Sequence, residues 1–337
     1  MDVGQFIESV KHDAMNIVNE ATQYDATKSV YGRLFPTAST NGLGYATGVS
    51  NVFSTEFREV KSGAPLENAE DVQGYKTVGV SRVWGIKKSY DYTLINRMRD
   101  IKPVTEGLAS FASGVELKKD QLCADIFNYG GFTTPTAASK QAFGVDGVSP
   151  EVPVPGNYTT DGLIYDGKPL FSLTGTAHPA KNGSTYINSI AQSLSIANLK
   201  TAWTAFSATN AKNEQGNPVD IIPPGGKAFL VVPPALKFTA MELVNQTSLA
   251  IAAAGTNDSR EFANLVEVVE WRKLTSATAW FLMSASQYGA QWLEEFPLRT
   301  SVVDNPADRK VIVAAEFAGG PWIRNWRFFH GNNVATS

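Results

Sequence analysis

The sequence is short of the residues that would build a redox, metal or membrane protein. Its 337 residues include one cysteine, Cys123, and three histidines. The chain can therefore close no internal disulfide and can build no zinc site from several thiolates. No apolar run approaches the ~18 residues of a membrane-spanning helix, and the first residues do not resemble a secretory signal. We expect a chain without a membrane segment, in a compartment that is reducing or indifferent to redox state.

Charged residues are also scarce, at 18% of the chain with a formal net charge of −3. A protein whose main task is to wrap nucleic acid usually carries a clear basic excess, so this balance argues against such a task. Residues 76–102 are a local exception, with seven basic and two acidic side chains. They could contact nucleic acid phosphates or form salt bridges to neighbouring subunits. The second interpretation is favoured, because no aromatic side chains interleave as single-strand binding would require.

Sequence motifs for catalysis are missing as well. The chain has no dinucleotide-binding or Walker loop, no nucleophile elbow and no H-E-x-x-H helix. Cys123 lies in the middle of an apolar helical pattern without a nearby base, which is typical of a buried structural residue. We therefore expect no catalytic residue, no metal ligand and no cofactor, and hence no enzyme. One alternative stays open, namely a hydrolase with an unrecognised site that uses His178 and Asp166.

A long amphipathic helix is predicted over residues 104–128, ahead of Gly130 and Gly131. Its apolar residues recur at spacings of three, four or seven, which places them on one helical face. They are Leu108, Phe111, Ala112, Val115, Leu122 and Ile126. At about 1.5 Å per residue the helix would be roughly 35–40 Å long, enough to act as the spine of a domain. An ordinary core helix is the alternative, and Gly107 and Gly114 would weaken either one.

The segments before this helix are predicted to lack a core of their own. Residues 1–23 have the apolar periodicity of a surface helix, whereas residues 24–49 are rich in Thr, Ser and Gly without a stable period. We expect 24–49 to form an extended arm that must lie on something. Residues 51–92 favour two strands, the second with a slip near Arg82. An isolated hairpin is only marginally stable in water, so a projecting one should pack on another chain.

The residues after the long helix form a loop-rich stretch to about residue 188, and a second compact unit follows. Ser195 suits the N-cap of a helix over 196–210. The apolar run 229–232 is typical of a strand that is covered on both faces. Pro234 suits the first turn of the helix that comes next. Helix, strand and helix in this order predict a small α/β unit.

Further strands are predicted toward the C-terminus. Residues 265–271 and 278–285 favour two of them. The last part of the chain reads as two more strands around Gly319, Gly320 and Pro321, because tryptophan and phenylalanine residues are frequent there.

Several short segments of this second unit resemble a known family. The segment IYDGKPLFSLTGTAHP comes first, and a later strand ends in VPPAL. Mu-type head subunits of tailed bacteriophages have the same ordered series, with a helix and a turn between. The matching positions are Asp166, Gly167, Leu170, Phe171, His178, Pro179, Gly216, Pro218 and residues 232–236. The series covers about residues 160–285, and the order of elements covers the whole chain. The sequence therefore resembles a tailed-phage major capsid protein.

The resemblance implies an α+β fold of the HK97-like major capsid type. A spine helix over about 104–129 would run through a peripheral domain that also carries a loop-rich insertion. The implied parts are an N-terminal arm (1–48), an extended β-hairpin loop or E-loop (49–92), the peripheral domain (93–190), an axial α/β domain (191–300) and C-terminal strands that return to the peripheral domain (301–337).

The resemblance also implies a function and its partners. Such subunits assemble as hexamers and pentamers into an icosahedral head that encloses double-stranded DNA by non-specific contact. Scaffold, portal and decoration proteins are further possible partners, and a membrane is not. The chain would then be part of the virion and would assemble in the host cytoplasm. An encapsulin-like cellular compartment with the same fold, which packages enzymes, is the alternative.

Subunit contacts are expected at three places. Tyr31, Leu34 and Phe35 on the arm would pack beneath or across a neighbour. Residues around Phe57 and Lys61 on the E-loop, together with Trp84 as the third ribbon position, would lie over an adjacent subunit. Loops of the axial domain would meet around the five-fold and six-fold centres.

Overall fold

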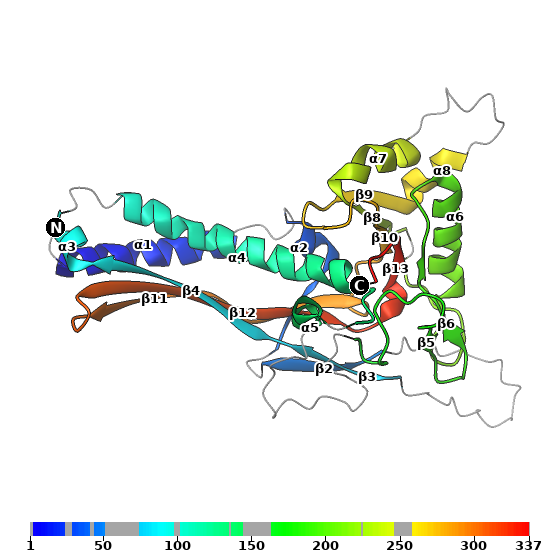
Figure 1. Ribbon diagram of the computed structural model, residues 1–337, viewed down its shortest axis with the longest axis horizontal. Coiled ribbons are helices and arrows are strands. Elements are labelled where there is room, and N and C mark those ends of the chain that lie inside the picture. The colour runs from blue at the N-terminus through cyan, green and yellow to red at the C-terminus, as the bar shows by residue number, and fades with distance from the viewer. Residues whose placement is uncertain are drawn as a thin grey trace, which may run out of the picture.

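The computed structural model describes residues 3–23, 29–40, 44–50, 74–97, 102–134, 136–143, 163–223, 225–245 and 258–336. The chain forms an elongated rod that joins a more compact block at one end (Figure 1). Helix α1 begins near the free end of the rod, and the last described residues lie near the junction. Of the helices in these ranges, none is long and apolar enough to span a bilayer.

Two long helices lie along one face of a sheet whose three long strands run antiparallel, and together they make up the rod (Figure 1). The helices are α1 (Val3–Gln23) and α4 (Lys102–Tyr129). The long strands are β4 (Arg82–Asp91), β11 (Ala290–Asn305) and β12 (Lys310–Ile323). The sheet has the order β1-β11-β12-β4, and α1 contacts both α4 and β11. The helices predicted for residues 1–23 and for about 104–129 are therefore confirmed.

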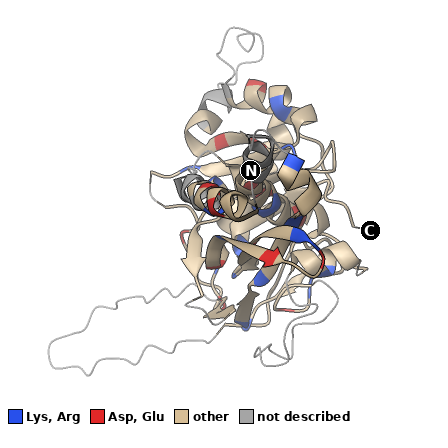
Figure 2. Ribbon diagram, turned by 90° about the vertical axis from the view of Figure 1, so that its left-hand side faces the viewer, with Lys and Arg blue, Asp and Glu red and all other residues tan. Residues whose placement is uncertain are grey.

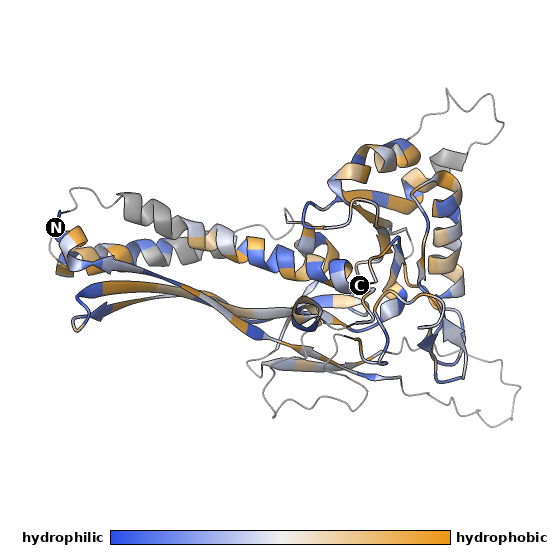
Figure 3. Ribbon diagram, viewed as in Figure 1, coloured by the Kyte–Doolittle hydropathy of each residue, from blue (hydrophilic) through white to orange (hydrophobic). Residues whose placement is uncertain are grey.

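Apolar periodicity explains why the helices and the sheet of the rod meet. In α4, Phe111 and Val115 are buried on the face that the spacing predicted. In β12, Val311 and Val313 are fully buried, whereas the residues between them are more exposed. A strand places alternate side chains on opposite faces, so only one face of β12 is covered by helices. Figure 3 shows this mixture of apolar and polar residues along both layers of the rod.

A short hairpin of β2 (Tyr45–Val49) and β3 (Lys76–Val80) lies beside the rod near the junction. The slip predicted near Arg82 falls at Ser81, where β3 ends and β4 begins. Strand β3 packs closely on β12: a Cβ atom built on Gly79 would come within 2.4 Å of the Trp322 side chain. A glycine is therefore needed at position 79 for the hairpin to reach the sheet.

The block is organised around a five-stranded mixed sheet with the order β7-β13-β10-β8-β9. Its strands are β7 (Ser189–Ile190), β8 (Ala228–Val232), β9 (Val266–Glu270), β10 (Trp280–Met283) and β13 (Phe329–Asn332). Strands β8 and β9 run parallel, as expected for a strand–helix–strand unit, and β10 runs antiparallel to β8. The apolar run predicted as a covered strand is β8, and the two strands predicted after it are β9 and β10.

Helices of the block begin where the sequence predicted. The Ser195 hydroxyl accepts a hydrogen bond from the Asn198 amide at 3.3 Å and caps the first of them. Pro234 opens the short helix that leads into α7. The block helices are α6 (Ile196–Thr204), the π-helix η2 (Ala205–Thr209), η3 (Pro234–Leu236), α7 (Lys237–Asn245) and α8 (Asp258–Leu265).

The remaining elements are short. They are α2 (Val30–Leu34), β1 (Thr37–Ser39), α3 (Tyr92–Arg97), α5 (Ala137–Ala142), β5 (His178–Pro179), β6 (Thr185–Tyr186) and η4 (Trp326–Phe328). The predicted extended arm is therefore partly regular, because α2, β1 and β2 fall within residues 24–49. Strand β1 pairs in parallel with β11, which holds this part of the chain on its own sheet.

The prediction of a strand boundary at Gly319, Gly320 and Pro321 is wrong. Strand β12 runs through all three residues, and the chain reverses earlier, between β11 and β12. Close packing explains the glycines: a Cβ on Gly319 would lie 2.6 Å from the Trp292 ring, and one on Gly320 would lie 2.5 Å from the Val80 carbonyl oxygen. These glycines therefore permit close contact inside a sheet and mark no turn.

Phe127, near the end of α4, joins the rod to the block. Its ring lies 5.0 Å from the Phe281 ring, 5.4 Å from the Trp271 ring and 6.0 Å from the Phe329 ring, measured between centroids. Two of these partners belong to the block sheet. On the other side the Phe127 ring meets that of Phe35, at 6.3 Å. One side chain of the spine helix thus fills the space where both cores meet.

Replacing Phe127 with alanine should destabilise the whole subunit. We expect Phe127→Ala to lower the free energy of unfolding by about 3–5 kcal/mol, because a buried ring is lost and a cavity remains. Denaturant unfolding of the purified, unassembled subunit measures this loss. Phe238→Ala is the matched control, since the Phe238 side chain is 74% exposed, and should change stability by about 0.5 kcal/mol or less. Equal losses in both variants would contradict the assignment of Phe127 as the joint.

Candidate functional site

The two residues of the hydrolase alternative do come together. Asp166 lies in the turn closed by the hydrogen bond from the Gly167 amide to the Ile164 carbonyl, and His178 begins β5. The His178 Nδ1 atom is 2.6 Å from Asp166 Oδ2, and both side chains are completely buried. The other ring nitrogen, Nε2, is 3.3 Å from the carbonyl oxygen of Leu170. Both nitrogens therefore already face an oxygen of the protein.

A buried ion pair lies next to the His178–Asp166 contact. Arg327 Nη1 is 3.0 Å from Glu214 Oε1, and each side chain is 1% exposed. The second carboxylate oxygen of Glu214 accepts a hydrogen bond from the Lys181 backbone amide at 3.0 Å. Trp326 separates the two pairs: its ring stacks on His178 at 4.3 Å and lies 4.6 Å from the Arg327 guanidinium. We call these residues the buried charged cluster.

The buried charged cluster also anchors the start of the E-loop. Tyr75 donates its amide to the Ser50 hydroxyl at 3.0 Å, and Ser50 donates its amide to the Tyr75 carbonyl at 2.8 Å. The Asn325 side chain donates to the Ser50 carbonyl, and the Lys181 ammonium lies 3.9 Å from the centre of the Tyr75 ring. The two residues that flank segment 51–73 are thus tied together and to the cluster. Phe57 and Lys61 themselves lie outside the described residues.

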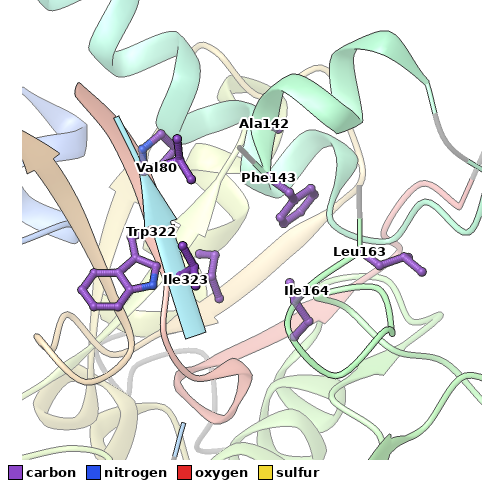
Figure 4. Close-up of a pocket in the computed structure, with 9 residues that line it drawn as sticks. Val80, Ala142, Phe143, Leu163, Ile164, Trp322 and Ile323 are labelled. Atoms are coloured by element: carbon purple, nitrogen blue, oxygen red, sulfur yellow. The ribbon is translucent and has the colours of Figure 1, made fainter. Parts of the chain in front are cut away.

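This geometry supports a structural role and gives none to catalysis. His178 has no free ring nitrogen to act as a base, and no surface opening reaches its fully buried side chain. A cavity beside Ile164 has a volume of about 10 Å³, room for about one water molecule. Figure 4 shows that apolar side chains such as Phe143, Ile164 and Ile323 line it. Within the described ranges, no three potential metal ligands gather.

The three arm residues that were expected to contact a neighbour lie in the core of their own chain. Tyr31 is 2% exposed, and Leu34 and Phe35 are 0% exposed. The Tyr31 hydroxyl donates to Glu116 of α4 at 2.8 Å, and its ring meets the Trp292 ring at 5.9 Å. Burial and the neighbouring carboxylate raise the pKa of Tyr31 far above its ordinary value. These three side chains therefore fasten the arm to the spine helix and leave no surface for a partner.

Asp120 of α4 shows why this docking is stable. Its two carboxylate oxygens accept hydrogen bonds from the Tyr31 amide at 3.3 Å and from the Trp271 indole at 3.0 Å. Burial raises the pKa of Asp120, and these hydrogen bonds lower it in part. One side chain of the rod thus binds both the arm and the loop after β9.

The Trp84 side chain also makes most of its contacts within its own chain. Its indole nitrogen donates to the Gly319 carbonyl at 3.3 Å, and the Lys118 ammonium lies 4.1 Å from its ring centre. The neighbouring apolar residues of β4 are more available, since Val83 is 61% exposed and Ile86 is 59% exposed. The subunit contact expected at Trp84 stays a prediction.

Basic residues of the 76–102 segment serve several roles. Lys88 donates to the Ser110 hydroxyl at 3.1 Å and lies 5.0 Å from the Phe111 ring centre, so it fastens β4 to α4. Lys87 and Arg97 are exposed. In the view of Figure 2, lysine and arginine residues are interspersed with acidic residues, without a face of one sign.

Other exposed apolar side chains had not been singled out from the sequence. The largest exposure belongs to Phe238 on α7, at 74%. The others are Leu94, Leu117, Ile187, Met241, Tyr288 and Val303. For α7 a signal was present, because Pro234, Phe238 and Met241 follow each other at spacings of four and three. That spacing predicts an apolar stripe, but it cannot tell a covered stripe from an exposed one.

Comparison with solved structures identifies the fold class. The chain is similar to the capsid of a native GTA particle, with a TM-score of 0.51, 11% identity and coverage of 90% of this chain and 89% of that one. It is also similar to the capsid of Ralstonia phage GP4, with a TM-score of 0.50, 12% identity and coverage of 88% and 86%. The rod, the block and their connection are thus the HK97-like fold of phage capsid proteins. A comparison with curated protein sequences finds no relative.

The family follows from the sequence itself. A family model described as phage capsid protein matches residues 74–331. The match includes the three long strands of the rod sheet, the spine helix and all of the block except the last residue of β13. The chain belongs to the phage capsid protein family, and it is a structural protein of the phage head, without enzymatic function. The resemblance to a tailed-phage capsid protein is thereby confirmed at the level of this family, while the Mu-type assignment stays a prediction.

The ion pair of the buried charged cluster should be essential for stability. Arg327→Met leaves the Glu214 carboxylate buried without its cation, and we expect a loss of about 3–5 kcal/mol in the free energy of unfolding. Arg33→Met is the control, because Arg33 and its partner Glu267 are 36% and 49% exposed and such pairs contribute about 1 kcal/mol at most. Denaturant unfolding of both variants tests this. A loss below about 1 kcal/mol for Arg327→Met would refute it.

His330 of β13 should make the subunit sensitive to acid. Burial lowers the pKa of His330 from 6.5 to about 4, and neither ring nitrogen has a hydrogen-bond partner. The unfolded chain takes up a proton below about pH 6.5, whereas the folded chain does so only near pH 4. Stability contributed by the neutral ring is therefore present above pH 6.5 and is lost as the pH falls toward 4, by about 3 kcal/mol at most.

Unfolding curves between pH 7 and pH 4 measure this loss. We expect His330→Leu to flatten the pH dependence relative to the unmodified chain, because an apolar side chain replaces an unpartnered polar one. His12→Leu, at an exposed histidine of α1, should leave the pH dependence as it was. If the His330 variant lost stability toward acid as steeply as the unmodified chain, the assignment would be incorrect.

Proposed function

We propose that this capsid protein assembles as hexamers and pentamers into an icosahedral head that encloses double-stranded DNA. The observation that carries the proposal is the match of residues 74–331 to the phage capsid protein family. Non-specific contact with DNA phosphates, assembly in the host cytoplasm and the use of scaffold, portal and decoration proteins belong to the same proposal.

The parts of the chain can be assigned to the domains that the proposed capsid subunit would have. We assign the part of the rod with α4 and β12 to the peripheral domain (93–190 with 301–337), the part of the block with α6 to β10 to the axial domain (191–300), residues 1–48 to the arm and 49–92 to the E-loop. The C-terminal β12 lies between β11 and β4, which fits strands that return to the peripheral domain. The boundaries are approximate where elements cross them, since β13 joins the sheet of the block.

Exposed residues of β4 support the contact proposed for the ribbon. Within the described residues β4 pairs only with β12, so it forms one edge of the rod sheet. An edge strand presents unpaired backbone groups that favour pairing with another chain. We propose that Val83 and Ile86, beside Trp84, meet an adjacent subunit together with Phe57 and Lys61 of the E-loop.

Electron microscopy of the purified, overexpressed chain, combined with light scattering, tests the assembly. We expect closed shells or rings of five and six subunits at high subunit concentration, because repeated weak contacts are stabilised by mass action. Shells that contain nucleic acid would support the phage head, and shells filled with a protein cargo would support the encapsulin-like compartment, which no observation favours at present. A chain that stays monomeric at high concentration, even with added scaffold protein, would overturn the proposal.

A further inference from the structure

Helix α7 carries an exposed apolar side chain that the fold of a single subunit does not explain. Phe238 is 74% exposed, more than any other large hydrophobic residue that the structure describes. Glu242 follows four residues later, is also exposed, and therefore lies on the same flank of the helix. We call Phe238 and Glu242 the α7 knob. A bare phenyl ring beside a carboxylate is a feature that favours a protein partner.

A groove lies along another flank of α7, between this helix, α8 and β9. Its volume is about 430 Å³. Its lining residues are Lys227, Lys237, Met241, Val244, Ala263, Val266, Glu267, Val268 and Glu270. The aliphatic members offer an apolar surface, and the charged members offer polar contacts beside it. We call this space the α7–β9 groove.

The knob lies beside the groove and does not enter it. Successive residues of an α-helix are rotated by about 100°, so Phe238 is about 60° around the helix from Met241, which lines the groove. Phe238 is 74% exposed and neither it nor Glu242 lines the groove, so the knob does not fill the groove of its own chain. A contact between the knob of one copy and the groove of another is heterologous, and repeated contacts of that type can close into rings.

The groove carries charges of both signs, since Lys227 and Lys237 line it together with Glu267 and Glu270, and Glu267 is paired with Arg33. The Lys227 ammonium donates to the Ala263 carbonyl oxygen at 2.7 Å, and no carboxylate among the described residues pairs with it. Lys237 is already paired with Glu270, at 2.6 Å. Glu242 of the knob has no ion pair among the described residues either. One unpaired cation at the groove and one unpaired anion on the knob could neutralise each other across an interface.

We propose that the α7 knob of one subunit binds in the α7–β9 groove of the next subunit around a ring. The Phe238 ring would pack on the aliphatic residues of the groove, and Glu242 would pair with Lys227. A second copy of this chain is the partner favoured by the structure, because both complementary surfaces lie on the same polypeptide and the family builds shells from many copies. The inference rests on the proposed assembly and names one of its contacts.

Charge reversal tests the pair directly. We expect Glu242→Lys to lower the assembled fraction about tenfold, because it places two cations together at the interface, and Lys227→Glu to do the same with two anions. The double variant, with Glu242→Lys and Lys227→Glu in every copy, restores opposite charges and should assemble within about twofold of the unmodified chain. Light scattering and electron microscopy measure the assembled fraction, and denaturant unfolding verifies that each variant is folded.

A second variant tests the apolar part of the contact. Phe238→Ser should lower the assembled fraction about tenfold, since it removes the ring from the groove. Val303→Ser is the matched control, because Val303 of β11 is 54% exposed and lies on the rod. Its assembled fraction should stay within about twofold of the unmodified chain.

The outcomes separate this inference from the proposed function. If the unmodified chain forms shells and Phe238→Ser or Glu242→Lys assembles equally well, the knob is no subunit contact. A double charge variant that assembles no better than the single ones also overturns the pairing of Glu242 with Lys227, whatever else occupies the groove. If the unmodified chain forms neither shells nor rings, the proposed assembly itself fails.

Discussion

The Arg327 guanidinium lies inside the protein and must be neutralised there, and this constraint organises the region where the rod meets the block. Its carboxylate partner, Glu214, comes from the loop after η2, more than one hundred residues earlier in the chain. A buried charge without a partner is strongly destabilising, so both segments must be in place together. The loops that supply His178 and Lys181 bind to the same cluster, and Ser50 and Tyr75 join it at its edge. The ion pair of Arg327 and Glu214 thus helps to fix the position of the base of the E-loop.

The spine helix α4 is also held in place by residues that are distant in sequence. Its carboxylates Glu116 and Asp120 accept hydrogen bonds from the arm, and its Phe127 ring enters the core of the block. Both a polar and an apolar set of contacts therefore connect the arm, the rod and the block along one helix. Many contacts therefore hold the centre of the subunit together. The surfaces that remain available to neighbouring subunits are edge strands and exposed flanks of helices.

Local patterns in the sequence were sufficient to predict many of the helices and strands. The features that they failed to predict depend on packing between residues that are distant in sequence. The spine helix, the cap at Ser195 and the strand β8 follow from periodicity and capping over a few residues. The arm could not be placed, because a segment rich in Thr, Ser and Gly becomes regular only when α4 and β11 supply partners. Gly319 and Gly320 were misread as a turn for the same reason: the rings and backbone that pack against them are distant in sequence.

The surfaces that contact neighbouring subunits are hard to predict from the sequence for a different physical reason. Large aromatic residues such as Tyr31 and Trp84 suggest an interface from sequence, yet their hydrogen-bonding atoms find partners within the chain. The most exposed of the large hydrophobic residues that the structure describes, Phe238, is placed on α7 by a spacing that would suit a buried face equally well. Which face of a helix is covered depends on the other elements, and in a shell it also depends on the next subunit. The exposure of Phe238 in the isolated chain is therefore the observation that points to a contact. A large apolar side chain gains stability only when it is buried, and in this chain a neighbouring subunit would have to bury it.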